Sequence, residues 1–223
     1  MAADPSATPR RRAAASLAAL TVLGLTLAAC GGTPSTQTTS GFTESNPDGK
    51  HGAVLTDPYV VPDVTLTATD GSDFSVTKDT DAPITLVFFG YTKCPDICSI
   101  VMADIASAMA RLDPEDRADV DVLLVTSDPA RDDPATLREY LDRFDPKFEG
   151  LTGDLDKIVA LGNELGVAIE KGPRLPSGGY EVTHGSQIVA IDEQDRSPIV
   201  WTEGTAPALL AEDLTDLLDE NRK

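Results

Sequence analysis

An apolar run at residues 84–89 leads within a few residues to Cys94 and Cys98, and this stretch constrains the fold more than any other. Its branched and aromatic side chains predict a buried strand. Pro95 has a fixed φ and no N–H, so it suits the first position of a helix and predicts a helix that starts beside Cys94. Cys98 then lies one turn further on, and both thiols face the same way.

Two uses of this cysteine pair stay open. The positive end of a helix dipole and its unpaired N–H groups favour thiolate over thiol. A disulfide can close between Cys94 and Cys98, although three intervening residues on a regular helix would strain it. A soft metal ion tolerates a wider gap between two sulfur atoms, but it needs a third ligand from elsewhere. A third interpretation, two buried structural cysteines, is disfavoured by the exposed helix start at Pro95 and Asp96.

The composition limits the size of the core and the kind of partner. The chain has 223 residues, of which 41% are hydrophobic, so it can build one ordinary domain core but not two large ones. Its formal net charge is −19, and we therefore expect no nucleic-acid partner. With only three cysteines, a scaffold stapled by disulfides is excluded.

The N-terminal residues have the layout of a secretory signal. Arg10, Arg11 and Arg12 precede a short apolar run that is rich in small residues. The run ends in Leu27-Ala28-Ala29-Cys30, which resembles the lipobox of bacterial lipoproteins, in which the cysteine is lipidated and becomes the mature N-terminus. A membrane-spanning helix is the alternative, but about 17 apolar residues are at the lower limit for spanning. We expect lipidation at Cys30, with the protein anchored on the extracytoplasmic side of the cell membrane.

This interpretation divides the chain into three parts. Residues 1–29 are the expected lipoprotein signal peptide. Residues 30–58 contain much Thr, Ser, Gly and Pro and few apolar side chains, which predicts a flexible tether. His51 lies in this tether and is expected to be solvated. Residues 59–223 are the expected folded domain.

Periodicity and turn signals predict alternating strands and helices in that domain, which makes it an α/β protein with an N-terminal β-hairpin. The expected elements are a hairpin at 64–69 and 74–76, a strand at 84–89, a helix at 95–112, a strand at 120–126, a helix at 134–144, a helix at 154–165, a short extension of the sheet at 167–169, a loop at 172–179, antiparallel strands at 187–191 and 198–201, and a closing helix at 207–220.

Three acidic residues and one methionine are expected near the predicted site. Asp128, Asp132 and Asp133 follow the 120–126 strand, at the carboxyl edge where α/β proteins place their sites. They either cap and close turns or hold the thiol site by a hydrogen bond. Met102 lies one helical turn after Cys98, and we expect it to pack in the core rather than bind a metal.

His184 is the candidate third ligand. A single histidine is more often a packed or surface residue than a ligand. Its context favours a ligand, because it is the only histidine in the expected domain and the cysteine pair lacks a third partner. The glycines and prolines of the 172–179 loop also suggest that His184 can be carried toward the thiols or away from them.

Three blocks together resemble the Sco/SenC family of copper chaperones. These are Gly90-Tyr91-Thr92-Lys93-Cys94-Pro95-Asp96-Ile97-Cys98, Ser127-Asp128-Pro129-Ala130-Arg131-Asp132-Asp133-Pro134 and Val182-Thr183-His184. The resemblance implies a thioredoxin-like fold, a central mixed sheet flanked by helices. It also implies that copper, as Cu(I) or Cu(II), is held by Cys94, Cys98 and His184.

In that family copper is delivered to the CuA centre of cytochrome c oxidase, so the implied partner is oxidase subunit II or another copper-accepting envelope protein. Some members act as thiol reductases on the same centre, and a redox-active pair of Cys94 and Cys98 is the alternative function. A copper-buffering protein without a dedicated client is a third. Two positions depart from the family pattern: Ser99 stands where a proline is common, and Thr183 where an aspartate is common.

Overall fold

A computed structural model describes residues 49–80, 82–174 and 180–222. The expected signal peptide, the lipidation site at Cys30 and most of the expected tether lie outside these residues. Within them, no helix is long and apolar enough to cross a membrane. The elements in chain order are β1 (Ala53–Val60), β2 (Thr65–Thr67), β3 (Asp73–Ser75), β4 (Ile84–Gly90), α1 (Cys98–Met109), α2 (Pro114–Ala118), β5 (Val120–Thr126), α3 (Pro134–Leu141), β6 (Glu149–Leu151), α4 (Leu155–Glu164), β7 (Ile169–Arg174), β8 (Tyr180–His184), β9 (Ile188–Asp192), β10 (Arg196–Trp201) and α5 (Pro207–Asn221).

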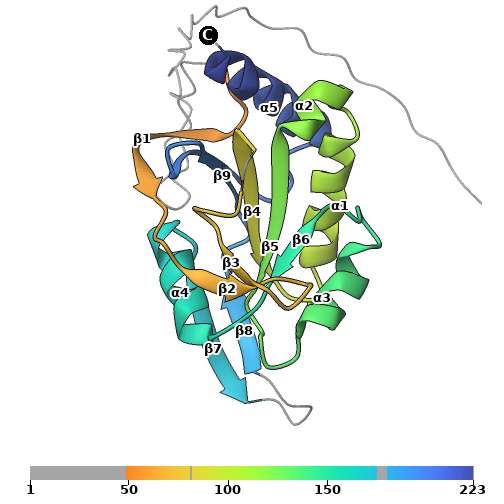
Figure 1. The fold of residues 1–223 in the computed structure, drawn as a ribbon, viewed down its shortest axis with the longest axis vertical. Helices are drawn as coiled ribbons and strands as arrows, with labels where there is room; N and C mark the ends of the chain where they lie inside the picture. Colours follow the sequence, from red (N-terminus) through yellow and green to blue (C-terminus); the bar gives the residue numbers. More distant parts are fainter. Residues whose placement is uncertain (1–48, 81, 175–179, 223) are drawn as a thin grey trace, which may run out of the picture. The chain divides into compact units, whose positions relative to one another are not determined.

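A mixed six-stranded sheet forms the centre of the domain, in the order β1-β10-β9-β4-β5-β6 (Figure 1). β4, β5 and β6 pair in parallel, whereas β9, β10 and β1 join antiparallel. Parallel neighbours need crossover connections, which α1 and α2 provide between β4 and β5, and α3 between β5 and β6. The carboxyl ends of these three parallel strands therefore lie at the same edge of the sheet.

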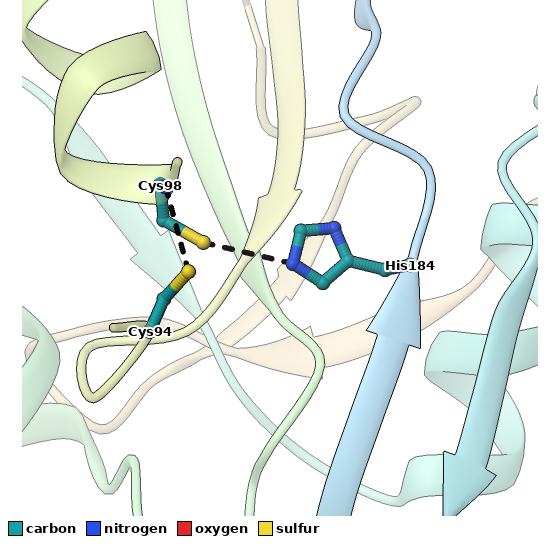
Figure 2. A group of neighbouring side chains, drawn as sticks. All are labelled: Cys94, Cys98 and His184. Carbon is teal, nitrogen blue, oxygen red and sulfur yellow. Dashed lines mark hydrogen bonds between the residues drawn. The ribbon is translucent and has the colours of Figure 1, made fainter. Parts of the chain in front are cut away.

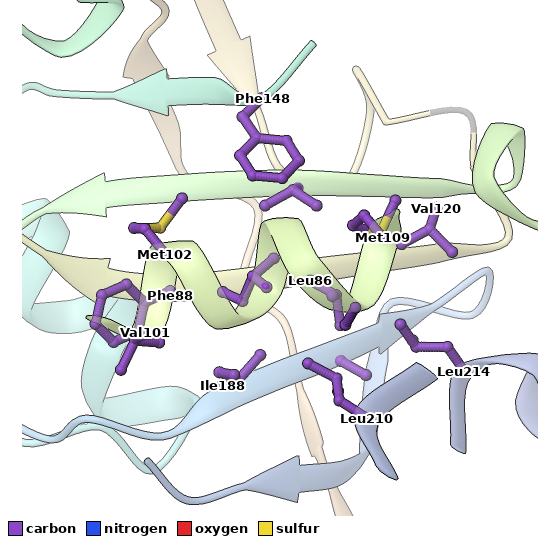
Figure 3. Close-up of a cluster of buried hydrophobic side chains, with 14 of the residues drawn as sticks. Leu86, Phe88, Val101, Met102, Met109, Val120, Phe148, Ile188, Leu210 and Leu214 are labelled. Atoms are coloured by element: carbon purple, nitrogen blue, oxygen red, sulfur yellow. The ribbon is translucent and has the colours of Figure 1, made fainter. Parts of the chain in front are cut away.

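β4 is buried along its whole length, because helices cover both faces of the sheet. Successive side chains of a strand point to opposite faces, so Leu86 and Phe88 join a core cluster with α1, α3 and α5. Figure 3 shows α1 packed in this cluster, and Met102 is fully buried there as expected. Val87 and Phe89 join the second cluster, with α4 and the β2–β3 hairpin. The predicted mixed sheet flanked by helices is confirmed.

The opening hairpin is also confirmed, since β2 and β3 pair antiparallel. The prediction that residues 167–169 extend the central sheet is wrong. β7 instead pairs with β8 in a separate two-stranded sheet, and it takes in Gly172, Pro173 and Arg174, which were expected in a loop. The reason is packing: Val167 and Ile169 are buried in the cluster shared by α4 and one face of the central sheet, so they pack on that face and do not pair in the sheet.

The folded part of the chain begins earlier than the expected boundary at residue 59. β1 starts at Ala53, inside the expected tether, and pairs with β10. Its side chains are only partly buried, so its composition resembles that of a tether. Backbone pairing with β10 holds it in place, together with partly buried Ala53, Leu55 and Tyr59, and hydropathy does not report such pairing.

Asp213 of α5 attaches the start of β1 to the core. This carboxylate is buried, and it accepts hydrogen bonds from the backbone N–H of His51 at 2.9 Å and of Gly52 at 2.8 Å. It also accepts the Trp201 indole N–H at 2.7 Å. A Cβ at Gly52 would lie 2.5 Å from that indole nitrogen, so the close approach requires glycine. His51, expected to be solvated, is therefore held at the domain surface by its backbone.

We predict that Asp213→Ala lowers the free energy of unfolding by about 3 kcal/mol, because it leaves the buried donors without an acceptor. Asp216→Ala on the same helix is the control: that carboxylate is exposed, and its loss is expected to cost about 0.5 kcal/mol or less. Denaturant unfolding of the two variants measures the difference. Equal stabilities would contradict the attachment role.

Candidate metal centre

The site begins where β4 ends at Gly90. A Cβ at this position would lie 2.8 Å from the Phe88 ring and 3.4 Å from the Cys98 sulfur, so glycine allows the strand end to pass beneath the cysteine. The chain then turns, and the Cys94 N–H donates to the Tyr91 carbonyl at 3.2 Å.

The helix starts one turn later than predicted, at Cys98 rather than at Pro95. Ile97 is the N-cap residue, and it offers no side-chain cap. Pro95 and Asp96 therefore precede the helix, although their residue types favour a helix start. The Cys98 backbone N–H points at the Cys94 sulfur at 3.5 Å, so this sulfur occupies the place of the missing cap. The predicted proximity of the thiols to a helix N-terminus therefore holds, with different geometry.

The structure brings all three sequence-predicted ligands together. The sulfur atoms of Cys94 and Cys98 and a ring nitrogen of His184 lie within 4.8 Å of one another. Figure 2 shows the two thiols reaching from the turn and the helix start toward the imidazole, which comes from the end of β8. The Cys98 sulfur lies 3.6 Å from His184 Nε2. The cysteine pair and the histidine thus meet from opposite sides of one site.

The imidazole of His184 has the tautomer and the neutral charge that a metal ligand needs. Its Nδ1 lies 2.8 Å from the Gly185 carbonyl oxygen, and a carbonyl can only accept, so Nδ1 carries the proton. The lone pair of Nε2 then faces the thiols. Burial lowers the pKa of His184, and it outweighs the opposing effects of the Gly185 carbonyl and the Glu203 charge. The ring is therefore neutral near neutral pH.

The two thiols differ in acidity. Burial raises the pKa of Cys94, but hydrogen bonds from the Cys98 thiol and from the N–H groups of Asp96, Ile97 and Cys98 outweigh it, and the net pKa lies below its usual value. Burial, together with the hydrogen bond to Cys94, raises the pKa of Cys98 to about 12. Cys94 is half-buried, whereas Cys98 is fully enclosed. Cys94 is therefore the accessible nucleophile of the pair.

Aromatic rings enclose the imidazole. The rings of Phe88 and Tyr91 meet the His184 ring edge to face, with centroids 6.2 Å and 5.9 Å away. These contacts limit its rotation and keep water from part of the ring. Sequence reasoning assigned no role to either aromatic residue, although Tyr91 lies in the cysteine motif. The Gly185 carbonyl was also missed, because a backbone acceptor leaves no signal in the residue pattern.

The acidic residues after β5 do both things considered from the sequence: they cap and close turns, and one of them hydrogen-bonds to the thiol loop. Asp133 caps α3 by accepting the Thr136 N–H at 2.8 Å. Asp128 forms a buried ion pair with Arg131. Asp132 instead accepts two hydrogen bonds from Thr92, in the turn that leads to Cys94.

The two departures from the family pattern lie at the rim of the site. Ser99 is exposed, and its hydroxyl lies 3.3 Å from that of the buried Tyr140. Thr183 is exposed on β8, one residue before His184. Neither change removes a candidate ligand.

The donor set suits a soft metal ion of low coordination number. A metal with bonds of about 2.3 Å to sulfur and 2.0 Å to nitrogen, in trigonal geometry, places those two donor atoms about 3.7 Å apart. The 3.6 Å between the Cys98 sulfur and His184 Nε2 fits this spacing. Two thiolates and one imidazole favour copper, whereas structural zinc takes four protein ligands.

Comparison with known proteins agrees with the fold and the site. The SCO1/SenC family model matches residues 54–219. Over 110 residues the chain is 34% identical to a Stutzerimonas stutzeri protein described as a candidate copper-binding protein, covering 48% of this chain and 52% of that relative. The matches span 39% to 55% of the length of the curated relatives.

Two solved structures are similar in fold. Bradyrhizobium japonicum ScoI with copper bound is 31% identical, with a TM-score of 0.61, and the match covers 72% of this chain and 98% of that one. The apo Sco1 protein from Thermus thermophilus is 27% identical, with a TM-score of 0.66, and the match covers 77% and 96%. The thioredoxin-like fold implied by the sequence resemblance is confirmed.

We predict that iodoacetamide modifies Cys94 well before Cys98 near neutral pH, because Cys94 has the lower pKa and the greater exposure. Peptide mass spectrometry of the reduced protein over time gives the two rates. In denaturant both thiols should react alike, which is the control. Equal rates in the folded protein would refute the asymmetry of the pair.

Proposed function

This chain belongs to the SCO1/SenC family, and from that membership and the geometry of the site we propose that it is a copper chaperone. Cys94, Cys98 and His184 bind one copper ion as cargo. The observation that carries the proposal is the convergence of these three donors within 4.8 Å, from two separate parts of the chain.

The proposed site accommodates both oxidation states of copper. Thiolates dominate the affinity for Cu(I), and the imidazole contributes more for Cu(II). Binding requires that both thiols lose their protons, and the buried Cys98 thiol, with its pKa of about 12, loses its own only when the metal replaces it. Copper affinity is therefore expected to rise with pH.

The difference in exposure suggests how the ion leaves. Cys94 is half-buried, so an acceptor thiolate can reach the copper ion on that side, while Cys98 and His184 still hold it. Ligands then exchange one at a time, and the ion is never released to water. The proposed acceptor is the CuA centre in subunit II of cytochrome c oxidase, or another copper-accepting envelope protein.

We further propose that Cys30 is lipidated after removal of residues 1–29. Two or more acyl chains, at about 0.8 kcal/mol per buried CH₂, hold a protein stably at a membrane. The domain would then work on the extracytoplasmic face of the cell membrane, where a copper-accepting oxidase domain is accessible.

A thiol-disulfide oxidoreductase is the second candidate function, and the unequal acidity of the thiols favours it. The Cys94 thiolate would attack one sulfur of a client disulfide and form a mixed disulfide, which breaks the client S–S bond and releases its other sulfur as a thiolate. Cys98 would then lose its proton and displace the client thiol, which leaves the client reduced and Cys94 and Cys98 joined. This route makes no use of His184. Copper buffering, the third candidate, uses the same ligands and differs only in lacking a client.

For the reduced soluble protein that starts after Cys30, we predict one copper ion per chain. Loss of a hydrogen-bond partner behind a metal ligand weakens metal binding by up to about 100-fold. Cys94→Ser and Cys98→Ser each remove a ligand itself, so each should weaken Cu(I) binding by more than that. His184→Ala should weaken Cu(II) binding more than Cu(I) binding. Chelator competition measures each affinity, and His51→Ala, outside the site, is the matched control. Full copper binding by the Cys94→Ser protein would show that the site is misassigned.

In cells, we predict that a deletion strain at limiting copper has low cytochrome c oxidase activity, partly restored by added copper. A plasmid copy of the gene should restore activity only when both Cys94 and Cys98 are present. A Cys30→Ser copy should yield protein that leaves the membrane fraction. If oxidase activity is unaffected by the deletion, chaperoning is ruled out, and buffering or thiol exchange is left.

A further inference from the structure

We propose that Asp132 is a positioning residue for the metal centre, and that its carboxylate holds the turn that brings Cys94 to Cys98 and His184. The inference rests on the proposed copper function. Asp132 is itself fully buried, and the hydrogen bonds of its carboxylate come from Thr92 and Thr126. It acts through Thr92, two residues before Cys94.

Both polar groups of Thr92 are bound by this one carboxylate. The Thr92 N–H donates to Asp132 Oδ2 at 2.9 Å, and the Thr92 hydroxyl donates to Oδ1 at 2.6 Å. Thr92 is the second residue of the turn that the hydrogen bond from Cys94 N–H to the Tyr91 carbonyl closes. These two hydrogen bonds to one buried carboxylate restrict both the backbone and the side chain of Thr92. They thereby restrict where the Cys94 sulfur lies.

The carboxylate is itself held by the sheet. The Thr126 hydroxyl, at the end of β5, donates to Asp132 Oδ2 at 2.7 Å. The Thr152 hydroxyl, just after β6, donates to the Asp132 backbone carbonyl at 2.8 Å. Thr92 follows the end of β4, so the ends of the three parallel strands converge on Asp132. Its position is therefore set by the most buried part of the domain.

A carboxylate suits this place better than other side chains of similar size. It is an acceptor at both oxygens, and here it meets three donors: one N–H and two hydroxyls. The Thr92 hydroxyl lies 2.6 Å and the Thr126 hydroxyl 2.7 Å from these oxygens, and hydrogen bonds to an ionised carboxylate are about twice as strong as neutral ones. Removal of the carboxylate leaves the Thr92 turn without its anchor.

The test compares variants that break the anchor with one that disturbs the same region but leaves it intact. Asp132→Ala removes the carboxylate, and Thr92→Val removes one donor, whereas Thr92→Ser keeps the hydroxyl. Thr152→Val loses a buried hydrogen bond to the Asp132 backbone but leaves the carboxylate bound to Thr92. Each variant is measured for Cu(I) affinity by chelator competition, for unfolding stability, and for amide exchange at residues 91–94 without metal.

We expect Asp132→Ala and Thr92→Val to weaken Cu(I) binding by about 10- to 100-fold and Thr92→Ser by no more than about threefold. Exchange at residues 91–94 should rise in the first two only. Thr152→Val should lose stability and keep its copper affinity. If Asp132→Ala does not fold, the two Thr92 variants decide the question.

Two results would overturn the inference. One is unchanged affinity and exchange in folded Asp132→Ala or Thr92→Val. The other is a Thr152→Val protein that loses copper affinity in proportion to its loss of stability. Affinity would then depend on stability in general, and Asp132 would be an ordinary structural residue. Failure of the proposed function is distinguishable, because the unaltered protein would then bind no copper, and the exchange at residues 91–94 in metal-free protein would still decide whether Asp132 holds the turn.

Discussion

The burial of β4 on both faces is the constraint on which the rest of the structure depends. A strand with core on each side cannot shift its register by one residue without exchanging the side chains of two clusters. Gly90 therefore leaves the sheet at a fixed point, beneath the Cys98 sulfur. The position of that strand end determines where the turn, the two thiols and the start of α1 lie.

The third ligand arrives by an independent route. His184 lies 86 residues after Cys98, on a two-stranded sheet that is separate from the central one. Its ring is oriented locally, by the Gly185 carbonyl and by edge contacts from Phe88 and Tyr91. A site assembled from two sheets can change its geometry when one moves relative to the other, which would suit the proposed role of a copper chaperone.

Much of this arrangement could be predicted from sequence, and the failures have physical causes. The buried strands, the cap at Asp133 and the closing helix follow from periodicity and local hydrogen bonding, which short segments record. β1 was missed because none of its side chains is fully buried, so it leaves no clear apolar pattern. The late start of α1 was missed because the Cys94 sulfur, which is not a usual capping group, takes the place of a side-chain cap. Spacing alone did not bring His184 to the cysteines: its being the only histidine in the expected domain made it a candidate, and the match to a family pattern assigned all three ligands.

The central claim is that copper is held by two sulfur donors and one imidazole nitrogen. X-ray absorption spectroscopy of the Cu(I)-loaded soluble protein tests this most directly, because it reports the ligands of the ion itself. The proposed site should give two sulfur ligands and one nitrogen ligand, with imidazole scattering that His184→Ala abolishes. A spectrum of sulfur ligands alone, or one that His184→Ala leaves unchanged, would contradict it.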